Sequence, residues 1–423
     1  MSDRLVHPGT ASGRVRAPPS KSYTHRALVA GHLSGRSYEV LAPLDSDDTR
    51  ATARALAALG TQVRFRHDRW TLEPRRRPGR HQRTIDCGES GTTLRFVAAL
   101  AARGTEPVLL VGRGRLPERP IEPLLQALER LGAVCERPAG QQSLPALVHG
   151  PLHGGHVELD ASVSSQFVSS LLLTLPTIRE DSSLALRGSI VSEPYIEATL
   201  AVLRFHQVRA ARRGRRFSIP GGQSYVGRRM TVPGDASSAA YLWAAGALTG
   251  GRVEVEGVSS EWPQADLAML SVLRRAGARV RVHRKGATVE GGSLRAFSVD
   301  LTSAPDLYPL VGVLAAGIPG TSELRGAAHV VHKESDRRAG TIALVRKLGG
   351  TARLSKQGLS IHGTSRPRAF RVRGLTDHRM VMSAAVAARA ASGPSSIGDA
   401  RVVSKSFPKF WSVLGSLREG AAP

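Results

Sequence analysis

The sequence predicts an α/β protein made of six similar units, arranged as two sets of three. Of its 423 residues, 41% are hydrophobic and 44 are glycine, which suits two or three globular domains with ample cores. A pattern also recurs about every 70 residues, which is longer than the usual solenoid repeat. Each copy starts with small polar residues and continues as an Ala/Leu/Val-rich helix, a strand and a second helix that usually ends at glycine. Six copies in register indicate one repeated α/β unit.

The first unit starts at residues 18–22, Pro-Pro-Ser-Lys-Ser. The two prolines disfavour a helix before this point, Ser20 is placed to cap one, and an apolar helical run follows. Lys21, Ser22 and Arg26 therefore fall in or beside the first turn, where unpaired backbone N–H groups and the helix dipole favour an anion. The stretch predicts an anion site, although an ordinary capped helix with solvated basic residues would show the same pattern.

The other elements follow in the same order along the chain. In the first unit, a strand is expected at 38–41 and a second helix at 47–59, with Asp47 and Asp48 as its caps. The later units should begin at residues 87–95, 162–166, 233–238, 302–306 and 376–380, with second helices starting near 118–120, 192–195 and 333–337. Further strands are expected at 107–111, 157–159, 253–255 and 280–282, and buried Ala-rich helices at 236–247 and 384–391.

The chain is strongly basic, with a formal net charge of +25. A basic surface can bind nucleic acid. However, only residues 73–83 and 209–216 form concentrated basic runs, both expected in loops or hairpins, and only 4% of the residues are aromatic and able to stack on bases. Seven of the 59 basic residues are lysine, so the excess lies in arginine and indicates a compositional bias. We therefore do not expect a nucleic acid partner. Because lysine is rare in this chain, and a guanidinium group cannot replace an ammonium group where a compact charge or proton transfer is needed, the few lysines point to candidate functional positions.

Other classes of protein lack their sequence signatures. No apolar stretch is long enough for a membrane span and no signal segment is recognisable, so no membrane association is expected. Cys87 and Cys135 are the only cysteines and lack the spacing of a metal cluster, so reduced thiols and a cytoplasmic location are expected. The sequence has no G-x-x-x-x-G-K-[ST] loop, no strand-borne G-x-G-x-x-G, no H-E-x-x-H and no C-x-x-C, which leaves ATP, dinucleotide and zinc chemistry without support.

Charged and hydroxyl side chains gather at the starts of the units. Such a set can bind a small polyanion, because charge-assisted hydrogen bonds contribute about 1.5–3 kcal/mol each and several together hold phosphate and carboxylate groups without a metal. The hydroxyls belong to Ser22, Thr92, Ser164, Ser165 and Ser192, the cations to Lys21, Arg26, Arg95, Arg119, Lys333, Arg337, Arg379 and Lys405, and the carboxylates to Asp306 and Glu334.

The same stretches, in the same order, resemble the 5-enolpyruvylshikimate-3-phosphate synthase family. The resemblance extends from about residue 8 to about residue 415, and several of the motifs are specific to that family. The motifs are Pro19-Ser20-Lys21-Ser22 with Arg26, residues 88–95, 118–121 and 162–166, Ser192 with Tyr195, and residues 234–235, 305–306, 333–337, 377–380 and 405–408.

The resemblance implies an α/β fold of two similar domains, each with three βαβαββ repeats around a pseudo-threefold axis. Residues 17–232 would form the first domain, and residues 1–16 and 233–423 the second. The resemblance also implies that the enolpyruvyl group of phosphoenolpyruvate passes to the 5-hydroxyl of shikimate 3-phosphate with release of phosphate, a step of the shikimate pathway towards chorismate and the aromatic amino acids. No cofactor and no metal would take part, and glyphosate would inhibit the reaction.

The resemblance further implies which residues bind and act. Shikimate 3-phosphate would contact Lys21, Ser22, Arg26, Ser164, Ser165, Gln166, Ser192, Tyr195, Asp306 and Lys333. Phosphoenolpyruvate would contact Lys21, Gly91, Arg119, Gln166, Arg337, Arg379 and Lys405. Asp306 would take the proton of the 5-hydroxyl and Glu334 would protonate the methylene carbon, with Lys21 as a further catalytic candidate. Two carboxylates of opposite role are needed because a hydroxyl is deprotonated while an enol carbon is protonated.

Two other hypotheses stay open at this point. UDP-N-acetylglucosamine enolpyruvyl transferase shares the fold and the donor but relies on a cysteine in a mobile loop, and neither Cys87 nor Cys135 is placed in such a loop. An RNA-end-processing or nucleic-acid-binding protein built from similar repeats would explain the net charge, and would require ATP or retain RNA. The interpretation preferred here is an enzyme for small anionic substrates that acts as a monomer.

Overall fold

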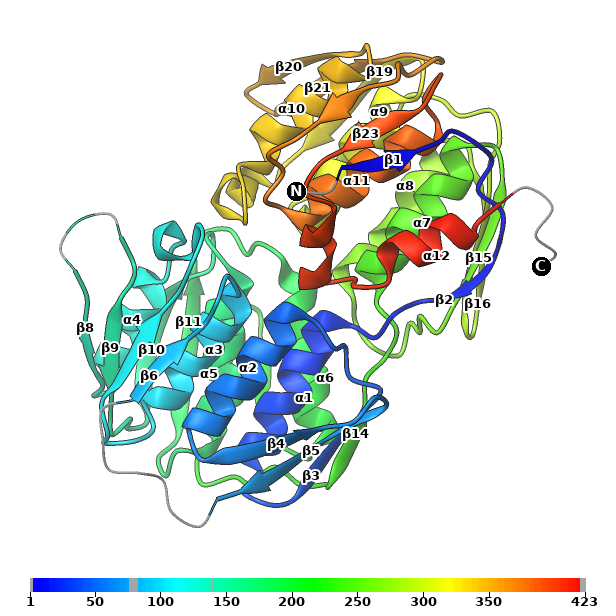
Figure 1. Ribbon diagram of the computed structural model, residues 1–423. Coiled ribbons are helices and arrows are strands. Elements are labelled where there is room, and N and C mark those ends of the chain that lie inside the picture. Colours follow the sequence, from blue (N-terminus) through cyan, green and yellow to red (C-terminus); the bar gives the residue numbers. More distant parts are fainter. Residues whose placement is uncertain (1–2, 76–82, 139, 141, 419–423) are drawn as a thin grey trace. The chain divides into compact units, whose positions relative to one another are not determined.

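The computed structural model describes residues 3–75, 83–138, 140 and 142–418, which form two compact domains (Figure 1). Domain I takes the chain up to Pro18 and again from Pro233 onward, and domain II consists of Pro19–Val232. The boundaries expected from the sequence are 16/17 and 232/233, so the first crossing lies two residues further along the chain.

Domain II contains three sheets of four strands, in the orders β14-β3-β5-β4, β6-β7-β9-β8 and β10-β11-β13-β12. In each sheet the first pair of strands is parallel and the other two pairs are antiparallel, as a βαβαββ repeat requires. The strands are β3 (Tyr38–Leu41), β4 (Thr61–Phe65), β5 (Arg69–Pro74), β6 (Arg83–Asp86), β7 (Val108–Val111), β8 (Val134–Glu136), β9 (Ala146–His149), β10 (Gly155–Asp160), β11 (Ser182–Arg187), β12 (Ala211–Arg213), β13 (Arg216–Ile219) and β14 (Arg229–Thr231). The helices are α1 (Lys21–Leu33), α2 (Asp47–Ala58), α3 (Gly91–Ala101), η1 (Leu116–Glu118), α4 (Glu122–Arg130), α5 (Ser165–Thr174), η2 (Leu175–Thr177) and α6 (Glu193–Phe205).

Domain I repeats this plan with one shorter sheet. Its sheets have the orders β16-β17-β15-β2, β18-β19-β21-β20 and β1-β23-β22. The strands are β1 (Arg4–Val6), β2 (Gly13–Arg16), β15 (Arg252–Glu256), β16 (Arg279–His283), β17 (Gly286–Glu290), β18 (Ser298–Asp300), β19 (Gly320–Arg325), β20 (Thr351–Ser355), β21 (Gly358–Gly363), β22 (Arg371–Val372) and β23 (Ser395–Ile397). The helices are α7 (Ala236–Leu248), η3 (Ala265–Leu267), α8 (Ala268–Arg275), η4 (Pro305–Leu307), α9 (Tyr308–Ala316), η5 (Ala328–His332), α10 (Arg337–Lys347), α11 (His378–Arg389), η6 (Ala400–Lys405) and α12 (Phe410–Ser416).

Two strands pair with distant partners where the chain changes domain. Strand β2 precedes α1 in the sequence but pairs in parallel with β15, and β14 precedes α7 but pairs in parallel with β3. The start of the chain also supplies β1, which lies antiparallel to β23 in Figure 1. Domain I therefore cannot complete its sheets from one continuous segment, because it needs strands from both of its segments, and domain II completes its first sheet only with β14, from the end of its own segment.

Each domain has a core of three helices, one from each repeat. Helices α1, α3 and α5 contact one another in domain II, and α7, α9 and α11 do so in domain I. Every residue of α9 is buried, as is every residue of α7 except Ser237 and Leu248, which is the all-round burial expected of core helices. The predicted buried Ala-rich helices at 236–247 and 384–391 are confirmed as α7 and the second half of α11. The mutual packing gathers the first turns of these helices within each domain.

Most predicted elements appear close to their expected positions, but the predicted caps are wrong. The strand at 38–41 is β3, and the helix at 47–59 is α2. Ser46, rather than Asp47 or Asp48, caps α2, because its side chain accepts from the backbone of Thr49 while the Thr49 side chain returns to Ser46. Ser20 occupies the N-cap position of α1, yet its side chain makes no capping hydrogen bond.

The structure describes the basic run at 209–216 in full and the run at 73–83 only at its two ends. Residues 211–219 include strands β12 and β13, which pair antiparallel, so the hairpin predicted at 209–216 is confirmed. Of the run at 73–83, residues 76–82 lie outside the described residues.

Gly234 provides a test of the packing where the chain enters domain I for the second time. A Cβ added at Gly234 would lie 2.4 Å from the carbonyl oxygen of Gly257 and 3.2 Å from the Cβ of Ala17. Because a backbone atom cannot move aside cheaply, we expect Gly234→Ala to lower the stability of domain I by about 1–3 kcal/mol. The midpoint of thermal unfolding, followed by circular dichroism, should fall by several degrees. Gly415→Ala is the control, since nothing lies within 4 Å of its added Cβ, and equal midpoints for the two variants would contradict the expected clash.

Candidate active site

Lys21 is the first residue of α1, and its ammonium group meets a carboxylate from the next helix. Lys21 Nζ donates to Asp48 Oδ2 at 2.8 Å, and both side chains are largely buried, with exposed fractions of 16% and 10%. Asp48 lies in the first turn of α2 and is available for this pair because Ser46 makes the cap. Sequence reasoning treated Asp48 as a cap, so its pairing with Lys21 is visible only in the folded chain.

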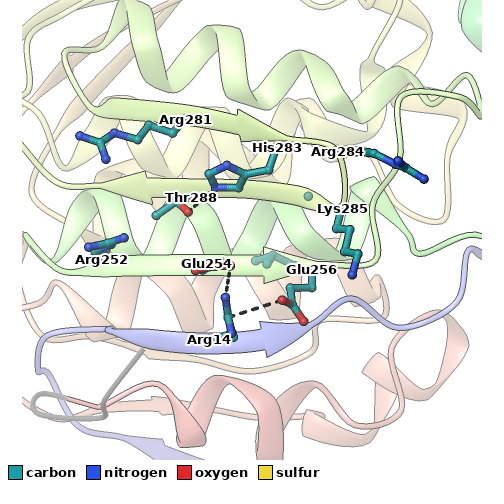
Figure 2. A pocket seen from close by; sticks show the side chains of 11 residues that line it. Arg14, Arg252, Glu254, Glu256, Arg281, His283, Arg284, Lys285 and Thr288 are labelled. Atoms are coloured by element: carbon teal, nitrogen blue, oxygen red, sulfur yellow. Dashed lines mark hydrogen bonds and ion pairs between the residues drawn. The ribbon is translucent and has the colours of Figure 1, made fainter.

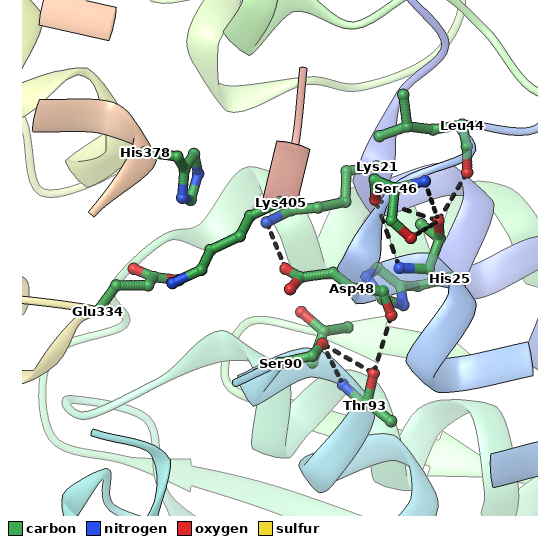
Figure 3. A network of polar contacts seen from close by, with 12 residues as sticks. Lys21, His25, Leu44, Ser46, Asp48, Ser90, Thr93, Glu334, His378 and Lys405 are labelled. Atoms are coloured by element: carbon green, nitrogen blue, oxygen red, sulfur yellow. Dashed lines mark hydrogen bonds and ion pairs between the residues drawn. The ribbon is translucent and has the colours of Figure 1, made fainter. Parts of the chain in front are cut away.

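A chain of hydroxyl groups links α1, α2 and α3 next to this ion pair, and Figure 3 shows Ser90, Thr93 and His25 among its members. Ser90 caps α3 and accepts from the Thr93 hydroxyl at 2.7 Å, and Thr93 is 2.7 Å from the Thr52 hydroxyl. Thr52 in turn lies 2.8 Å from Nδ1 of His25, which is completely buried. Burial, together with the charges of Lys21 and Arg26, keeps the pKa of His25 well below its usual value, so the imidazole is neutral. The network therefore fixes the helix starts without adding charge.

Arg26, a predicted substrate ligand, holds three helices of domain II together. Its guanidinium donates to the Thr199 hydroxyl at 2.9 Å, to the Ser169 hydroxyl at 3.2 Å and to the carbonyl oxygens of Ser22 and Tyr195, both at 2.9 Å. Burial lowers its pKa to about 10, which still leaves it charged at neutral pH. Four of its five N–H groups thus donate to described residues, so Arg26 positions Ser22 and Tyr195 as well as being a candidate ligand.

Gly91 begins α3 beside two arginines. A Cβ added there would lie 2.1 Å from Arg95 Nη1 and 2.7 Å from Arg119 Nη2. Arg95 is buried and donates to the carbonyl oxygen of Pro120 at 2.6 Å and to Gln166 Oε1 at 3.4 Å. The absence of a side chain at Gly91 therefore lets both guanidinium groups reach the start of the helix.

The remaining predicted residues of domain II lie at the starts of α5 and α6. Ser164 caps α5 by accepting from the backbone of Gln166, and Ser165 is buried as the first residue of that helix. The amide of Gln166 donates to the Thr92 hydroxyl at 3.0 Å, which ties α5 to α3. Ser192 precedes α6 in a left-handed conformation with φ 55°, which non-glycine residues rarely adopt outside functional or tightly held turns.

In domain I, Arg337 lies at the centre of a buried cluster of charges. Only 1% of its side chain is exposed. Its guanidinium donates to Asp377 Oδ2 at 2.8 Å, to Asp306 Oδ1 at 2.7 Å and to Glu334 Oε2 at 2.6 Å. Burial alone would lower the pKa of Arg337, but Asp377, Glu334 and Asp306 outweigh that effect and raise it. Three carboxylates thus hold one cation permanently charged.

Asp306, the predicted base, is surrounded by cations. Besides Arg337, it accepts from Arg379 Nη2 at 2.8 Å, and Lys333 Nζ lies 3.6 Å away. Arg379 and Asp377 belong to the start of α11, where Asp377 is the cap and accepts from the Arg379 backbone at 2.8 Å. Burial tends to raise the pKa of Asp377, but Arg337 overcomes it and lowers the pKa below its usual value.

Two further cations and a histidine complete the domain I set. Lys405, in η6, donates from Nζ to the carbonyl oxygen of Thr376 at 3.1 Å, next to the cap of α11. Glu334 and Lys333 follow η5, where His329 is buried. Burial and, secondly, the charge of Lys333 lower the pKa of His329 to about 4, so it is neutral at physiological pH.

The fold and these charges have a counterpart among known families. A profile of the EPSP synthase (3-phosphoshikimate 1-carboxyvinyltransferase) family matches residues 6–414. The chain belongs to the EPSP synthase family. It is 39% identical to a 3-phosphoshikimate 1-carboxyvinyltransferase of Methanocella arvoryzae over 96% of each chain, and 40% identical to one of Thermococcus kodakarensis that covers 96% of this chain and 98% of the relative. Its fold matches an EPSP synthase structure from Acinetobacter baumannii with a TM-score of 0.82 at 23% identity, covering 99% of this chain and 98% of the other.

Each domain of this EPSP synthase family member brings its own predicted residues together. Domain II gathers Lys21, Ser22, Arg26, Gly91, Arg119, Ser164, Ser165, Gln166, Ser192 and Tyr195 at the starts of its helices. Domain I gathers Asp306, Lys333, Glu334, Arg337, Arg379 and Lys405 around the starts of α10 and α11. Sequence reasoning did not select Asp48 or Asp377 as site residues, because their partners lie 27 and 40 residues away in the chain.

A second group of charges belongs to the surface rather than to this site (Figure 2). A concavity of about 730 Å³ on the sheet β16-β17-β15-β2 is lined by Arg14, Arg252, Arg281, His283, Arg284, Lys285 and Thr288, among others. Arg14 pairs with Glu254 at 2.8 Å and with Glu256 at 3.5 Å, and about half of its side chain is exposed. Ion pairs so exposed contribute little to stability. The predicted ligand residues lie elsewhere.

Within the part of the chain that the structure describes, no three His, Cys, Asp or Glu side chains are grouped so that they could hold a metal ion. Nor does any helix there combine the length and apolar character needed to cross a bilayer.

The buried ion pair between Arg337 and Asp377 should contribute to the stability of domain I. Replacing it by methionine leaves Asp377, whose side chain is completely buried, without its main countercharge, and removing one partner of a buried ion pair costs about 3–5 kcal/mol. We expect Arg337→Met to lower the free energy of unfolding by that amount at pH 7, measured with urea. The exposed Arg346→Met, in the same helix, should change it by less than about 0.5 kcal/mol.

The pH dependence of this difference follows from the lowered pKa of Asp377. A carboxylate with a lowered pKa contributes stability above its unfolded value, here 3.8, and loses it as the pH falls through the folded value. The part of the gap that comes from the lowered pKa of Asp377 in wild type should therefore be present well above pH 3.8 and shrink as the pH falls below that value. A gap that stays constant down to pH 3 would show that Arg337 does not stabilise this carboxylate.

Proposed function

We infer that the protein catalyses the reaction for which its family is named. It transfers the enolpyruvyl group of phosphoenolpyruvate to the 5-hydroxyl of shikimate 3-phosphate and releases phosphate. The observation that carries this conclusion is the match of the family profile over residues 6–414, together with relatives of the same name at 36–40% identity along almost the whole chain. A coupled assay of phosphate release with both substrates tests it directly, and release that requires both is the expected result.

We propose that the groups at the helix starts of domain II bind shikimate 3-phosphate. The hydroxyls of Ser164 and Ser165 lie beside the first N–H groups of α5, and Ser192 precedes α6, so each stands where a phosphate or carboxylate is favoured. Lys21 adds a compact positive charge at the start of α1. Tyr195 and Ser22, held through their carbonyls by Arg26, and Gln166, held by Thr92, would complete the contacts from this domain.

Phosphoenolpyruvate would be held by the arginines, with Gly91, Gln166, Lys21 and Lys405 beside them. Arg119 reaches the start of α3 in domain II, and Arg337 and Arg379 present two guanidinium groups in domain I. Planar guanidinium groups suit carboxylate and phosphate, because they can donate two parallel hydrogen bonds. We propose that the carboxylate of phosphoenolpyruvate takes over Arg379 from Asp306, an exchange of one carboxylate for another that preserves the charge balance.

This exchange would release Asp306 from Arg379 for its role as base. Asp306 would then take the proton of the 5-hydroxyl while the oxygen attacks C2 of phosphoenolpyruvate, and Glu334 would give a proton to C3. The tetrahedral product of this addition would lose phosphate and return a proton from its methyl group. The cations around Asp306 would stabilise the leaving phosphate, so the chemistry requires no cofactor.

The two competing hypotheses receive no support from the site. Burial raises the pKa of both Cys87 and Cys135 to about 12, and a thiol that stays protonated is a poor nucleophile or acid at neutral pH. This disfavours a cysteine-dependent enolpyruvyl transferase. The basic run that the structure describes lies on the hairpin of β12 and β13, which contains none of the predicted ligands, and this does not favour an RNA-binding protein.

We also propose that the enzyme acts as a monomer in the cytoplasm. The predicted ligands all come from one chain, and both cysteines are buried free thiols, as suits a reducing compartment. Size-exclusion chromatography with light scattering tests the first point, and fractionation of cells tests the second.

The lysines provide a prediction with matched controls. Lys21→Ala removes a cation from the start of α1 and Lys405→Ala one from η6, and we expect kcat/KM to fall about 100-fold or more because a charge-assisted contact is lost in the transition state. Lys285→Ala and Lys356→Ala remove exposed lysines of domain I and should change kcat/KM by less than about twofold. Near-normal turnover by Lys21→Ala would remove it from the proposed site.

Glu334 provides a prediction about proton transfer. In deuterated water, the proposed methyl-bearing intermediate should place deuterium on C3 of recovered phosphoenolpyruvate and of product. Glu334→Gln keeps the size and hydrogen-bonding reach of the side chain but cannot transfer a proton, so it should retain binding of shikimate 3-phosphate while turnover and exchange are both lost.

The alternative is that Glu334 serves only as the salt-bridge partner of Arg337, three residues along the chain. Exchange at the parent rate in Glu334→Gln would favour that alternative. Glu290→Gln, which alters a carboxylate in an exposed pair with Arg279, is the control and should leave exchange unchanged.

A further inference from the structure

Arg26 is a buried cation that meets only neutral oxygen atoms in the described part of domain II. The residue is 2% exposed, and its guanidinium donates to the hydroxyls of Thr199 and Ser169 and to the carbonyl oxygens of Ser22 and Tyr195. Among the described residues it forms no ion pair with an aspartate or a glutamate. Burying a charge without a countercharge is costly, so this arrangement requires an explanation.

The neutral surroundings of Arg26 leave its positive charge for an anion that comes from outside the protein. Arg337 in domain I is buried just as deeply but meets three carboxylates, which offset its charge. The oxygen atoms around Arg26 satisfy its N–H groups and carry no full negative charge. An anionic ligand would therefore meet a charge that the protein has not already neutralised.

Two hydroxyls determine how the guanidinium of Arg26 is oriented. Its Nε donates to Thr199 Oγ1 at 2.9 Å, and its Nη2 donates to Ser169 Oγ at 3.2 Å and to the carbonyl oxygen of Tyr195 at 2.9 Å. The face of the group is covered as well, since its central carbon lies 5.6 Å from the centroid of the Phe96 ring. Because a guanidinium is planar and rigid, contacts that hold Nε and Nη2 also fix the direction of Nη1.

The two hydroxyls also connect Arg26 to the first turn of α6. Thr199 and Ser169 are completely buried, and each accepts from Arg26, so their own hydrogens must go to other oxygen atoms. Thr199 Oγ1 lies 2.9 Å from Ser169 Oγ and 3.0 Å from the carbonyl oxygen of Tyr195, and Ser169 reaches the same carbonyl at 3.5 Å. Nη1 donates once, to Ser22, so one N–H group of Arg26 has no acceptor among the described residues.

We propose that Thr199, together with Ser169, is a positioning residue that holds Arg26 so that its last N–H group meets an anionic group of shikimate 3-phosphate. This rests on the proposed function, in which Arg26 and Tyr195 contact that substrate. A carboxylate in place of either hydroxyl would also satisfy the guanidinium, but it would neutralise the charge that the substrate needs. The hydroxyls hold the cation without competing with the substrate for it.

The test is the binding of shikimate 3-phosphate to the full chain, measured by isothermal titration calorimetry at pH 7.5. Thr199→Val keeps the shape of the side chain but leaves the buried Nε–H of Arg26 without an acceptor, so the guanidinium loses its fixed direction. We expect the Kd for shikimate 3-phosphate to rise about tenfold. The KM for phosphoenolpyruvate, at saturating shikimate 3-phosphate, should change much less. Thr199→Ser restores the hydroxyl and should bring the Kd back to within about twofold of wild type.

Two further variants separate the positioning role from a general loss of packing. Thr61→Val makes the same change at another buried hydroxyl of domain II, which lies 2.8 Å from Nδ1 of His32, and it should leave the Kd unchanged. Ser169→Ala removes the acceptor of one Nη2 hydrogen and should raise the Kd about three- to fivefold. Ser169→Ala also carries the test if Thr199→Val does not fold.

Three results would overturn the proposal. The first is a Kd within twofold of wild type in both Thr199→Val and Ser169→Ala. The second is a Thr199→Ser variant that binds as weakly as Thr199→Val, because the methyl group rather than the hydroxyl would then matter. The third is an equal loss of binding in Thr61→Val, which would indicate a general effect of removing a buried hydroxyl.

Arg26→Lys separates this proposal from the proposed function. If Arg26 binds shikimate 3-phosphate, Arg26→Lys should raise the Kd, and adding Thr199→Val should raise it little further, because lysine has no Nε–H group for Thr199 to hold. An unchanged Kd in Arg26→Lys would overturn the assignment of Arg26 as a ligand. A raised Kd in Arg26→Lys with normal values in Thr199→Val and Ser169→Ala would overturn only the positioning role.

Discussion

The contacts of Arg337 with three carboxylates are the interaction on which the chemistry of domain I depends. Its guanidinium is almost completely buried, and it joins the cap of α11, the carboxylate of η4 and Glu334 before α10. None of these groups could be buried alone, because an isolated charge in a protein interior is strongly destabilising. The requirement that each charge meet an opposite one therefore determines how the helix starts of this domain are arranged.

In domain II, helices α1, α2 and α3 are joined mainly by neutral hydrogen-bonding groups. Its helix starts are joined by hydroxyls and by a histidine kept neutral through burial, with the Lys21–Asp48 pair at the edge of that network. Hydroxyl groups can donate and accept, so such a network can join the helices without any net charge. The two domains thus share a repeat but differ in what they present: hydroxyls together with cations that mostly meet neutral oxygens in one, and closely balanced charges in the other.

This difference suits a reaction that moves a proton and expels phosphate. Carboxylates that are already paired with arginines can exchange partners with an anionic substrate, because the number of charges around each guanidinium does not change. A balanced cluster also explains how Asp306 can stand next to Arg337 and Arg379 and still be a candidate base.

Several local features were predictable from the sequence because neighbouring residues determine them. The strand β3 and the buried helix α7 follow from short patterns of apolar residues, and the cations at the unit starts follow from their motifs. The caps were predicted wrongly, because Asp47, Ser46 and Thr49 all favour a helix start and only the folded turn shows that Ser46 makes the capping box.

What the sequence by itself determined is the repeat, the kind of element at each position and the residue types at the helix starts. These depend on periodicity and on residues a few positions apart. Only the tertiary structure decided which carboxylate each cation meets: Lys21 and Asp48 are 27 residues apart, and Arg379 and Asp306 are 73 residues apart. The first pair forms because α1 packs against α2 within one repeat, and the second because segments of different repeats pack together in domain I. No local pattern specifies which of several acidic residues such packing brings to a given cation.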